Sequence, residues 1–256
     1  MMLAITDLQL AYQETTIVPN LSITFPKNQI IALLGPNGCG KSTLLKALAR
    51  LLKPKSGHIC YQAVDIWQKS AKAYTKTLAF LPQRHIVPEG ISVKELVSFG
   101  RSPYLNMWGR LSLQDENLVE QALAATQMAQ FADYPVISLS GGQQQRAFLA
   151  MVLAQNTEII LLDEPTTYLD LSHQAELMAM MRTLQQQGKT IITVLHDLNQ
   201  ACRYCDHLVV LKQGELIKQG TPQQVMSEQL LKQVFDLDVE IHADPVSHTP
   251  MFVFKS

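Results

Sequence analysis

Hydrophobic and polar positions follow two different periods along the chain. Residues 2–13 and 15–26 alternate with period two and are separated by polar turn residues, which predicts a small antiparallel sheet. Residues 29–34 are continuously apolar up to Gly35, as in a strand buried on both faces of a parallel sheet. Residues 42–52 then show helical periodicity. The pattern therefore predicts two paired strands, followed by a strand, a glycine loop and a helix.

The middle of the chain, from about residue 91 to residue 156, is almost entirely helical in pattern. Ser112 and Asp115 have the spacing of a capping box, and another helix is expected after Leu139. This stretch is predicted to form an inserted helical lobe.

Strand and helix patterns alternate in the rest of the chain. Residues 158–164 and 190–197 are apolar strand candidates, with a crossover helix expected at 173–188, which predicts a mainly parallel sheet. The tail contains a hairpin pattern at 207–220, a helix opened by a Thr-Pro pair, and a β-rich stretch at 239–254.

Composition excludes some classes of protein. The 256 residues are 47% hydrophobic and 17% charged, as in an ordinary globular protein. The formal net charge of −1 provides no long-range field for a polyanion, so we expect no nucleic-acid partner, although a local basic patch is compatible with the sequence. No apolar run is long enough to cross a bilayer, and Asp7 comes early with no basic leader before it, so a cytoplasmic chain is expected.

The cysteines indicate a reducing compartment rather than a disulfide framework. There are four of them, unevenly spread. Cys202 and Cys205 have helical spacing and His207 is near, but a zinc site would need a second ligand pair, and none stands at a suitable interval. We therefore expect no cysteine metal site.

A phosphate loop follows the first buried strand. Residues 35–42 fit the pattern G-x-x-x-x-G-K-S, with the required strand before it and helix after it. Backbone N–H groups and the helix N-terminus are expected to bind phosphates, Lys41 to reach the β and γ oxygens, and Ser42 to bind Mg²⁺. The nucleotide-binding residues predicted here are Gly35, Pro36, Asn37, Gly38, Cys39, Gly40, Lys41, Ser42 and Thr43.

Cys39 lies inside this loop. The helix dipole and Lys41 would favour a thiolate there, although a small residue at a position without a role is the simpler interpretation. We expect alkylation of Cys39 that ATP blocks.

Two acids and a histidine follow later strands. Asp163 and Glu164 stand at the end of one strand, where the first can bind Mg²⁺ and the second can accept a proton from water; solvated turn residues are the alternative. His196 follows the next strand and is positioned to orient the water, although a lone histidine is more often structural.

A second glycine loop lies at residues 139–143, before a helix. Ser140, Gly141 and Gly142 place N–H groups at a helix N-terminus, where an anion binds well, or form an ordinary N-cap. This loop belongs to the helical lobe, so the phosphate loop with Lys41 of the same chain is an unsuitable partner for it. A second copy of the chain could supply the phosphate loop that faces it across one phosphate.

The motifs GPNGCGKST, LSGGQ, IILLDE and LHD, in this order, resemble the ATP-binding cassette superfamily over nearly the whole chain. The resemblance implies an α/β fold: a P-loop NTPase (RecA-like) core with an N-terminal antiparallel β subdomain and an inserted helical subdomain. It implies a single ATPase domain, with the core at 1–90 and 157–220, the helical signature subdomain at 91–156 and a C-terminal helix and β extension at 221–256.

The same resemblance implies ATP and Mg²⁺ as ligands and a head-to-tail dimer in which each ATP lies between the phosphate loop of one subunit and the signature of the other. The signature residues are Leu139, Ser140, Gly141, Gly142 and Gln143. Catalytic roles are implied for Lys41, Gln83, Glu164 and His196, and magnesium binding for Ser42, Gln83 and Asp163. Tyr12 corresponds to an aromatic that stacks on adenine, and Asp170 to a loop that crosses the dimer interface, next to an unusual Tyr168.

Within the superfamily, residues 88–116, 154–174 and 196–222 resemble bacterial importers of ferric siderophores and cobalamin. The resemblance implies import of a ferric chelate by a homodimer at the cytoplasmic face of the inner membrane. Iron(III) dicitrate is the expected cargo, with another siderophore or cobalamin as the alternative. Separate permease subunits are implied, and a periplasmic or surface substrate-binding protein indirectly.

Tyr104, Met107 and Trp108 offer an apolar face that either receives a permease helix or fills the lobe's own core. Two other functions remain as alternatives: an ATPase of this superfamily outside transport, and a scaffold that binds ATP as a switch without turnover. The presence of both Glu164 and His196 argues against the scaffold.

Overall fold

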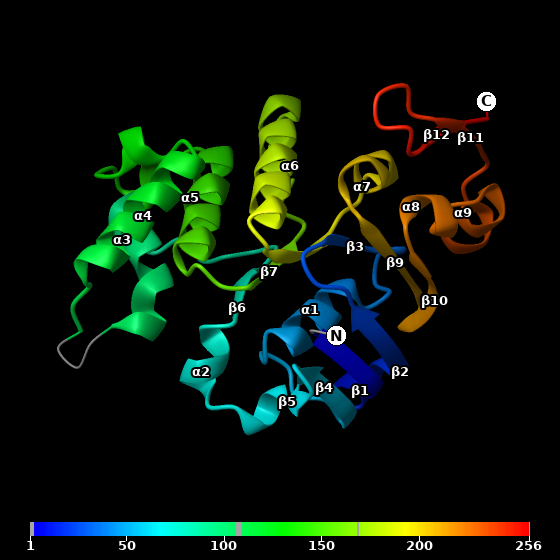
Figure 1. The fold of residues 1–256 in the computed structure, drawn as a ribbon, viewed down its shortest axis with the longest axis horizontal. Coiled ribbons are helices and arrows are strands. Elements are labelled where there is room, and N and C mark those ends of the chain that lie inside the picture. Colours follow the sequence, from blue (N-terminus) through cyan, green and yellow to red (C-terminus); the bar gives the residue numbers. More distant parts are fainter. Residues whose placement is uncertain (1–2, 106–108, 168, 256) are drawn as a thin grey trace. The chain divides into compact units, whose positions relative to one another are not determined.

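The computed structural model describes residues 3–105, 109–167 and 169–255 (Figure 1). The chain divides into two compact units, the first made of Met1–Lys69 and Met181–Ser256, the second of Ser70–Met180. None of the helices in the described ranges combines the length and the apolar character that a bilayer span requires.

The first unit begins with an antiparallel sheet. Strand β1 (Leu3–Tyr12) pairs with β2 (Thr15–Phe25) on one side and with β4 (Ser56–Tyr61) on the other, and β4 pairs with β5 (Val64–Asp65). The period-two alternation of β1 buries one face of the sheet. The predicted pairing of the first two strands is confirmed, whereas β4 and β5 carried no pattern that we recognised.

A second sheet in this unit is mainly parallel. Strand β3 (Ile30–Leu34) lies between β8 (Thr190–Val194) and β9 (His207–Lys212), parallel to both, and β10 (Glu215–Gly220) pairs antiparallel with β9. Every residue of β3 and β8 is buried, which explains their continuous apolar sequence. The predicted buried parallel strands and the hairpin are confirmed.

The remaining elements of the first unit are short. They are α1 (Lys41–Leu48), η1 (Ile66–Gln68), α7 (Leu198–Tyr204), α8 (Pro222–Val225), α9 (Glu228–Phe235), β11 (Val239–Ala243) and β12 (Pro250–Phe254). Helix α1 ends earlier than its periodicity predicts, because Arg50 adopts a left-handed conformation with φ 60°. The Asn199 side chain of α7 accepts a 2.8 Å hydrogen bond from the Phe252 N–H, which attaches the C-terminal hairpin to α7.

The second unit contains two parallel strands and a group of helices (Figure 1). Strand β6 (Leu78–Leu81) pairs with β7 (Ile159–Asp163). The helices are α2 (Ala71–Thr75), α3 (Val93–Ser98), η2 (Phe99–Tyr104), α4 (Leu113–Ala125), η3 (Ala129–Phe131), η4 (Val136–Ser138) and α5 (Gly141–Ala154). Helix α6 (Leu171–Gln186) begins in this unit and ends in the first. The helical character of residues 91–156 and the Ser112–Asp115 capping box are confirmed; the subdomain boundaries stay a prediction.

A buried ion pair ties these helices together. The Arg101 guanidinium contacts Oδ1 of Asp115 at 2.7 and 2.8 Å and donates to the carbonyls of Ala154 and Gln155 at 2.9 and 3.0 Å. Gly100 permits this approach, because a Cβ there would lie 2.1 Å from the Met151 carbonyl oxygen. The arginine thus links η2, α4 and the end of α5.

Candidate functional site

The phosphate loop connects β3 to α1 in the first unit. Gly35, Gly38 and Gly40 all have positive φ, at 149°, 77° and 101°. A side chain at Gly35 is excluded because its Cβ would lie 2.1 Å from the Leu211 carbonyl oxygen. Gly40 is the N-cap of α1 and has no side chain to cap the first-turn N–H groups, which therefore suit an anion.

Lys41 bends back over this loop. Its Nζ donates hydrogen bonds to the carbonyl oxygens of Gly35 at 2.7 Å and Pro36 at 2.9 Å, and only 6% of the residue is exposed. The ammonium group is thereby held beside the glycine loop, where it can pair with phosphate oxygens. Ser42 and Thr43 follow in the first turn of α1, at the positions that the loop pattern requires.

A thiolate at Cys39, the interpretation that we did not favour, is opposed by burial. Burial raises the pKa of this thiol, and the nearby Lys41 opposes that rise without overcoming it. The residue is only 4% exposed, and Nζ of Lys41 lies 3.8 Å from Sγ. Desolvation disfavours the charged form more strongly than the neighbouring cation favours it.

His196 shares a sheet edge with the phosphate loop. Leu33 in β3 stands opposite Val194 in the parallel strand β8. Two residues further along, the two strands lead to Gly35 and His196, so both residues leave the sheet at its carboxyl edge. His196 is exposed there.

Tyr12 belongs to the same unit. It is the last residue of β1 and is 43% exposed, and Nζ of Lys46 in α1 lies 6.0 Å from the centroid of its ring. The first unit thus brings an accessible aromatic face beside the helix that begins at the phosphate loop.

In the second unit, parallel pairing brings Gln83 to Glu164. Leu81 of β6 stands opposite Leu162 of β7, and each strand continues two residues to one member of this pair. The Gln83 amide Nε2 donates a 2.6 Å hydrogen bond to Oε2 of Glu164. Asp163, the last residue of β7, directly precedes Glu164 in the sequence. It is 2% exposed, so its carboxylate is buried.

Glu164 itself has an unusual backbone conformation. Its φ is 53°, in the left-handed region that non-glycine residues rarely occupy. The Thr167 hydroxyl is 3.5 Å from Oε2 of the same carboxylate. A strained backbone with convergent side-chain donors is typical of a functional position rather than of a solvated turn.

The signature residues form the N-terminus of α5. Ser140 and Gln143 make a reciprocal capping box, in which Ser140 Oγ accepts from the Gln143 N–H and Gln143 Oε1 accepts from the Ser140 N–H. The N-cap that we considered as the alternative is present, whereas binding of an anion at this loop stays a prediction. Gly141 and Gly142 contribute first-turn N–H groups, which have no acceptor within a helix, and a Cβ on Gly141 would meet open space.

Asp170 stands before α6. Its Oδ1 accepts from the Ser172 hydroxyl and the His173 N–H, both at 2.9 Å, and lies 2.7 Å from Nδ1 of His173. These donors, the His173 N–H first, hold the pKa of Asp170 below its ordinary value. Its side chain is 65% exposed. Tyr168, Met107 and Trp108, which the sequence singles out, lie outside the described residues.

The predicted residues therefore fall into separate groups. The first unit holds the phosphate loop, Tyr12 and His196; the second holds Gln83, Asp163 and Glu164, and also the signature and Asp170. The magnesium ligands expected from the sequence are therefore divided: Ser42 belongs to the first unit, and Gln83 and Asp163 belong to the second.

Gln145 is a functional candidate that sequence reasoning missed. It is 4% exposed, and its Nε2 donates to the carbonyl of Pro165, the residue after Glu164, at 3.4 Å. The sequence does contain a signal for this residue: a glutamine stands one helical turn before Leu149, on the apolar face of α5.

Comparison with known proteins agrees with this geometry. Residues 18–167 match the family described as ABC transporter. The chain belongs to the ABC transporter family. It is 52% identical to the achromobactin transport ATP-binding protein CbrD of Dickeya dadantii over 98% of this chain and 95% of that one. It is 45% identical to the iron(3+)-hydroxamate import ATP-binding protein FhuC of Bacillus subtilis, over 97% and 93%.

The likeness extends to solved structures of ABC transporters. An inward-facing metal-chelate type ABC transporter matches with a TM-score of 0.83 and 29% identity, over 100% of this chain and 97% of that one. The dimeric structure of a bacterial ABC transporter cassette matches with a TM-score of 0.77 and 27% identity, over 86% and 98%. The predicted α/β ATPase fold is therefore confirmed, and the chain carries the ATP-binding domain of an ABC ATPase.

Proposed function

We propose that this ABC ATPase hydrolyses ATP to drive import of a ferric chelate through separate permease subunits. The observation that carries the proposal is its similarity, over nearly its whole length, to ATP-binding proteins named for achromobactin transport and for iron(3+)-hydroxamate import. A third relative, at 43% identity, is the ferric enterobactin transport ATP-binding protein FepC of Escherichia coli. Iron(III) dicitrate is the specific cargo that we propose to test first.

The nucleotide is proposed to bind at the phosphate loop. The N–H groups of Gly38 to Thr43 surround its phosphates, while Lys41 supplies the positive charge that faces the β and γ oxygens. Lys41 already lies against the loop carbonyls of Gly35 and Pro36, so little side-chain ordering is needed on binding. Tyr12 is proposed to stack on the adenine ring, for which its exposed face is suited.

Ser42, Gln83 and Asp163 are proposed to hold Mg²⁺. A hydroxyl, an amide oxygen and a carboxylate are all oxygen donors, the ligand type that this hard cation prefers, so the residues present fit the ion. When bound, Mg²⁺ neutralises charge on the β and γ phosphates.

Glu164 is proposed as the general base. Its carboxylate takes the proton of the water whose oxygen attacks the γ phosphorus, while the bond from that phosphorus to the oxygen that remains on ADP breaks. Gln83 donates to Oε2 of this carboxylate, which fixes the orientation of the group. His196 is proposed to donate a hydrogen bond to the γ phosphate and so hold the water in line.

Two copies of the chain are proposed to complete two sites. Gly141 and Gly142 of one subunit offer N–H groups to the ATP held by the phosphate loop of the other, which explains why one chain has two glycine loops. Asp170, 65% exposed, is proposed to lie at this interface. The similarity to a dimeric cassette supports the arrangement.

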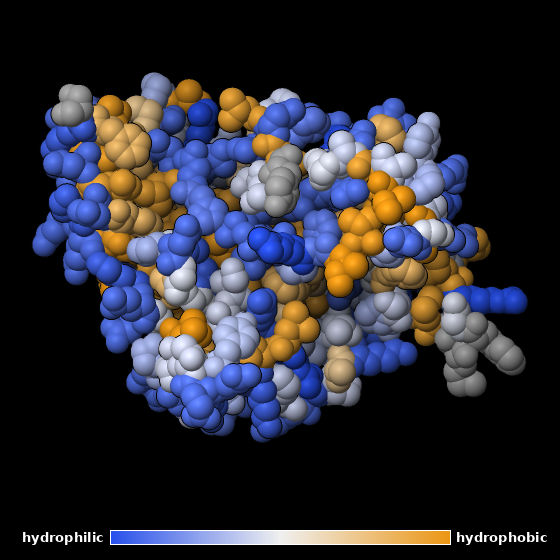
Figure 2. Space-filling view, turned by 180° about the vertical axis from the view of Figure 1, so that it is seen from behind, coloured by the Kyte–Doolittle hydropathy of each residue, from blue (hydrophilic) through white to orange (hydrophobic). Residues whose placement is uncertain are grey.

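The permease is proposed to contact apolar side chains of the second unit. Ile86 is 92% exposed, and Phe99, Tyr134 and Ile137 are each more than half exposed. Figure 2 shows apolar side chains among polar ones on one face of the molecule. Their exposure favours a partner surface. The chain is thus proposed to act at the cytoplasmic face of the bacterial inner membrane, with a substrate-binding protein on the opposite side.

Uptake of radiolabelled iron tests the proposal. Cells that carry either this chain or its Lys41→Ala variant are supplied with iron as citrate and, separately, as a hydroxamate siderophore. We expect loss of citrate-dependent uptake in the variant. Loss of uptake with the hydroxamate alone would support a transport ATPase but replace iron(III) dicitrate by a hydroxamate siderophore as the cargo. No loss of uptake with either iron source would favour an ATPase outside transport.

A further inference from the structure

The segment between β6 and α3 carries Gln83 but has few polar contacts of its own. Residues 84–90 form no helix or strand. Within the described ranges they make no hydrogen bond or ion pair with another residue, whereas Gln83, just before them, bonds to Glu164. A segment with so few bonds has little to hold it in one conformation. Its position therefore depends on side-chain packing.

His85 packs against helix α5. Its imidazole ring lies on the ring of Phe148, with centroids 3.7 Å apart and planes inclined by 37°. Phe148 is 5% exposed and belongs to the buried side of α5, so its ring is a fixed surface. His85 stands two residues after Gln83. The stack thus attaches the segment to α5 close to the residue that bonds to Glu164.

The imidazole of His85 contributes its aromatic surface rather than its nitrogens. Its Nδ1 is buried, and neither ring nitrogen has a hydrogen-bond partner in the part of the chain that the structure describes. Burial also lowers the pKa of His85, which favours the neutral ring. A neutral ring without hydrogen bonds acts through its stacking contact. An apolar aromatic side chain should therefore be able to replace it.

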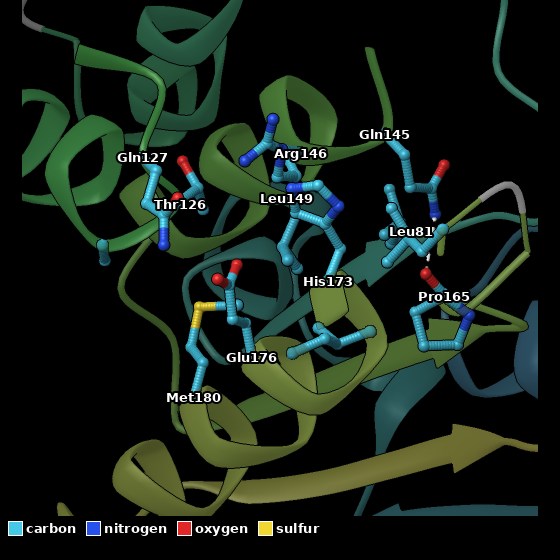
Figure 3. A pocket seen from close by; sticks show the side chains of 13 residues that line it. Leu81, Thr126, Gln127, Gln145, Arg146, Leu149, Pro165, His173, Glu176 and Met180 are labelled. Carbon is cyan, nitrogen blue, oxygen red and sulfur yellow. Dashed lines mark hydrogen bonds between the residues drawn. The ribbon is translucent and has the colours of Figure 1, made fainter. Parts of the chain in front are cut away.

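The same face of α5 also reaches the segment after β7. Gln145 and Phe148 are three residues apart, so they share one face of the helix. Nε2 of Gln145 donates to the carbonyl of Pro165 at 3.4 Å, and Figure 3 shows the two residues side by side. Pro165 directly follows Glu164. One helix face therefore contacts the chain beside both members of the Gln83–Glu164 pair.

We infer that His85 is a positioning residue for the Gln83–Glu164 pair. Its stack on Phe148 holds residues 84–90 against α5 and so keeps the Gln83 amide within hydrogen-bond distance of the Glu164 carboxylate. This role rests on the proposed function, in which Glu164 is the general base. Because α5 begins at the signature residues, the stack also links the orientation of the base to the helix whose N-terminus is proposed to meet the partner's ATP.

Steady-state ATPase kinetics of the full chain test the role of the stack. His85→Ala should lower kcat about three- to tenfold, the loss expected for one aromatic pair. KM for ATP should change less than about twofold, because the phosphate loop is untouched. His85→Phe should keep kcat within about twofold of wild type, since it restores a ring against Phe148. A His85→Phe variant as slow as His85→Ala would show that an imidazole nitrogen is needed, and would overturn the inference.

Two further variants separate the stack from the rest of the segment. Phe148→Leu removes the other ring and should lower kcat to the same extent as His85→Ala, with folding of each variant checked by circular dichroism. Arg84→Ala is the matched control, since this exposed side chain directly precedes His85, and it should leave kcat unchanged. An equal loss in Arg84→Ala would contradict a specific role of the stack.

A double variant tests whether His85 acts through Gln83. The combination of His85→Ala with Gln83→Ala should be no slower than Gln83→Ala alone, because no amide is then left to position. Multiplicative losses would contradict this route.

NMR of the Gln83 side-chain amide gives a readout that needs no turnover. In isotope-labelled protein, the amide proton that bonds to Glu164 should resonate apart from exposed glutamine amides in wild type and in His85→Phe. In His85→Ala it should move toward the position of the exposed amides. Its absence in Gln83→Ala assigns the signal. An unchanged signal in His85→Ala would overturn the inference. If no sample hydrolyses ATP, the proposed function fails, and this signal still decides whether His85 positions Gln83.

Discussion

The side-chain amide of Gln83 donates a 2.6 Å hydrogen bond to the carboxylate of Glu164, across a separation of 81 residues. The two residues follow neighbouring parallel strands in register, which places them at the same sheet edge. Glu164 therefore has one oxygen fixed by a neutral donor, while its backbone is held in a left-handed conformation. This arrangement makes the pair the most sharply testable part of the proposed mechanism.

Replacing Glu164 with Gln should lower the ATPase rate by roughly 10²–10⁴-fold, because the amide cannot accept the proton of the attacking water. ATP binding should persist, since the phosphate loop is unchanged. Steady-state turnover and the binding of a fluorescent ATP analogue measure the two effects. The exposed Glu120→Gln serves as a matched control and should be neutral. Full turnover in Glu164→Gln would rule out the assignment of the base.

Replacing Gln83 with Ala should lower turnover by about 10–100-fold, the loss expected for a hydrogen bond to a charged group. The effect should largely disappear in the Glu164→Gln background, because there is then no carboxylate to orient. A double-mutant cycle on the ATPase rate measures this dependence. Independent, multiplicative losses would show that Gln83 acts on something other than Glu164.

Cys39 should react slowly with alkylating reagents, because burial raises the pKa of its thiol above the ordinary 9.0. Its reaction rate should continue to rise with pH beyond 9.0, since the raised pKa moves thiolate formation to higher pH. Bound ATP should block the reaction. Mass spectrometry follows the site, with the less buried Cys60 as an internal reference that ATP leaves unaffected. A rapid reaction at neutral pH would mean that the thiol is not desolvated as described.

Replacing Asp115 with Asn should lower the free energy of unfolding by about 3–5 kcal/mol, because Arg101 is then buried without its counter-charge. Burial alone would raise the pKa of Asp115, but hydrogen bonds from Ser112 and Arg101 outweigh it, and the pKa is lowered. The stabilisation is therefore present above the ordinary value of 3.8 and is lost as the pH falls below it, through the lowered pKa.

Urea denaturation of wild type and Asp115→Asn between pH 7 and about pH 3 measures this difference. The gap between the two curves should narrow toward the acid end, because protonation of Asp115 removes in wild type what the substitution removes at every pH. The exposed Asp133→Asn is the control. A constant gap over the whole range would indicate that the ion pair does not carry the effect.

Local signals in the sequence were sufficient for much of the fold. Continuous apolar runs identify β3, β7 and β8, because strands buried on both faces need no polar side. A capping box identifies the start of α4, and a serine before two glycines the start of α5, because the hydrogen bonds involved span only three residues. The phosphate loop is equally local, since its glycines, lysine and serine act through positions fixed by their own spacing.

Other features depended on the tertiary structure, because they arise between residues that are distant along the chain. Strand β6 has only four residues and too little periodicity to be recognised, yet its register with β7 joins Gln83 to Glu164. The pKa of the Cys39 thiol depends on burial, which raises it more than the neighbouring Lys41 lowers it. Spacing thus determines local hydrogen bonds and helix ends, whereas desolvation and long-range register are decided by packing.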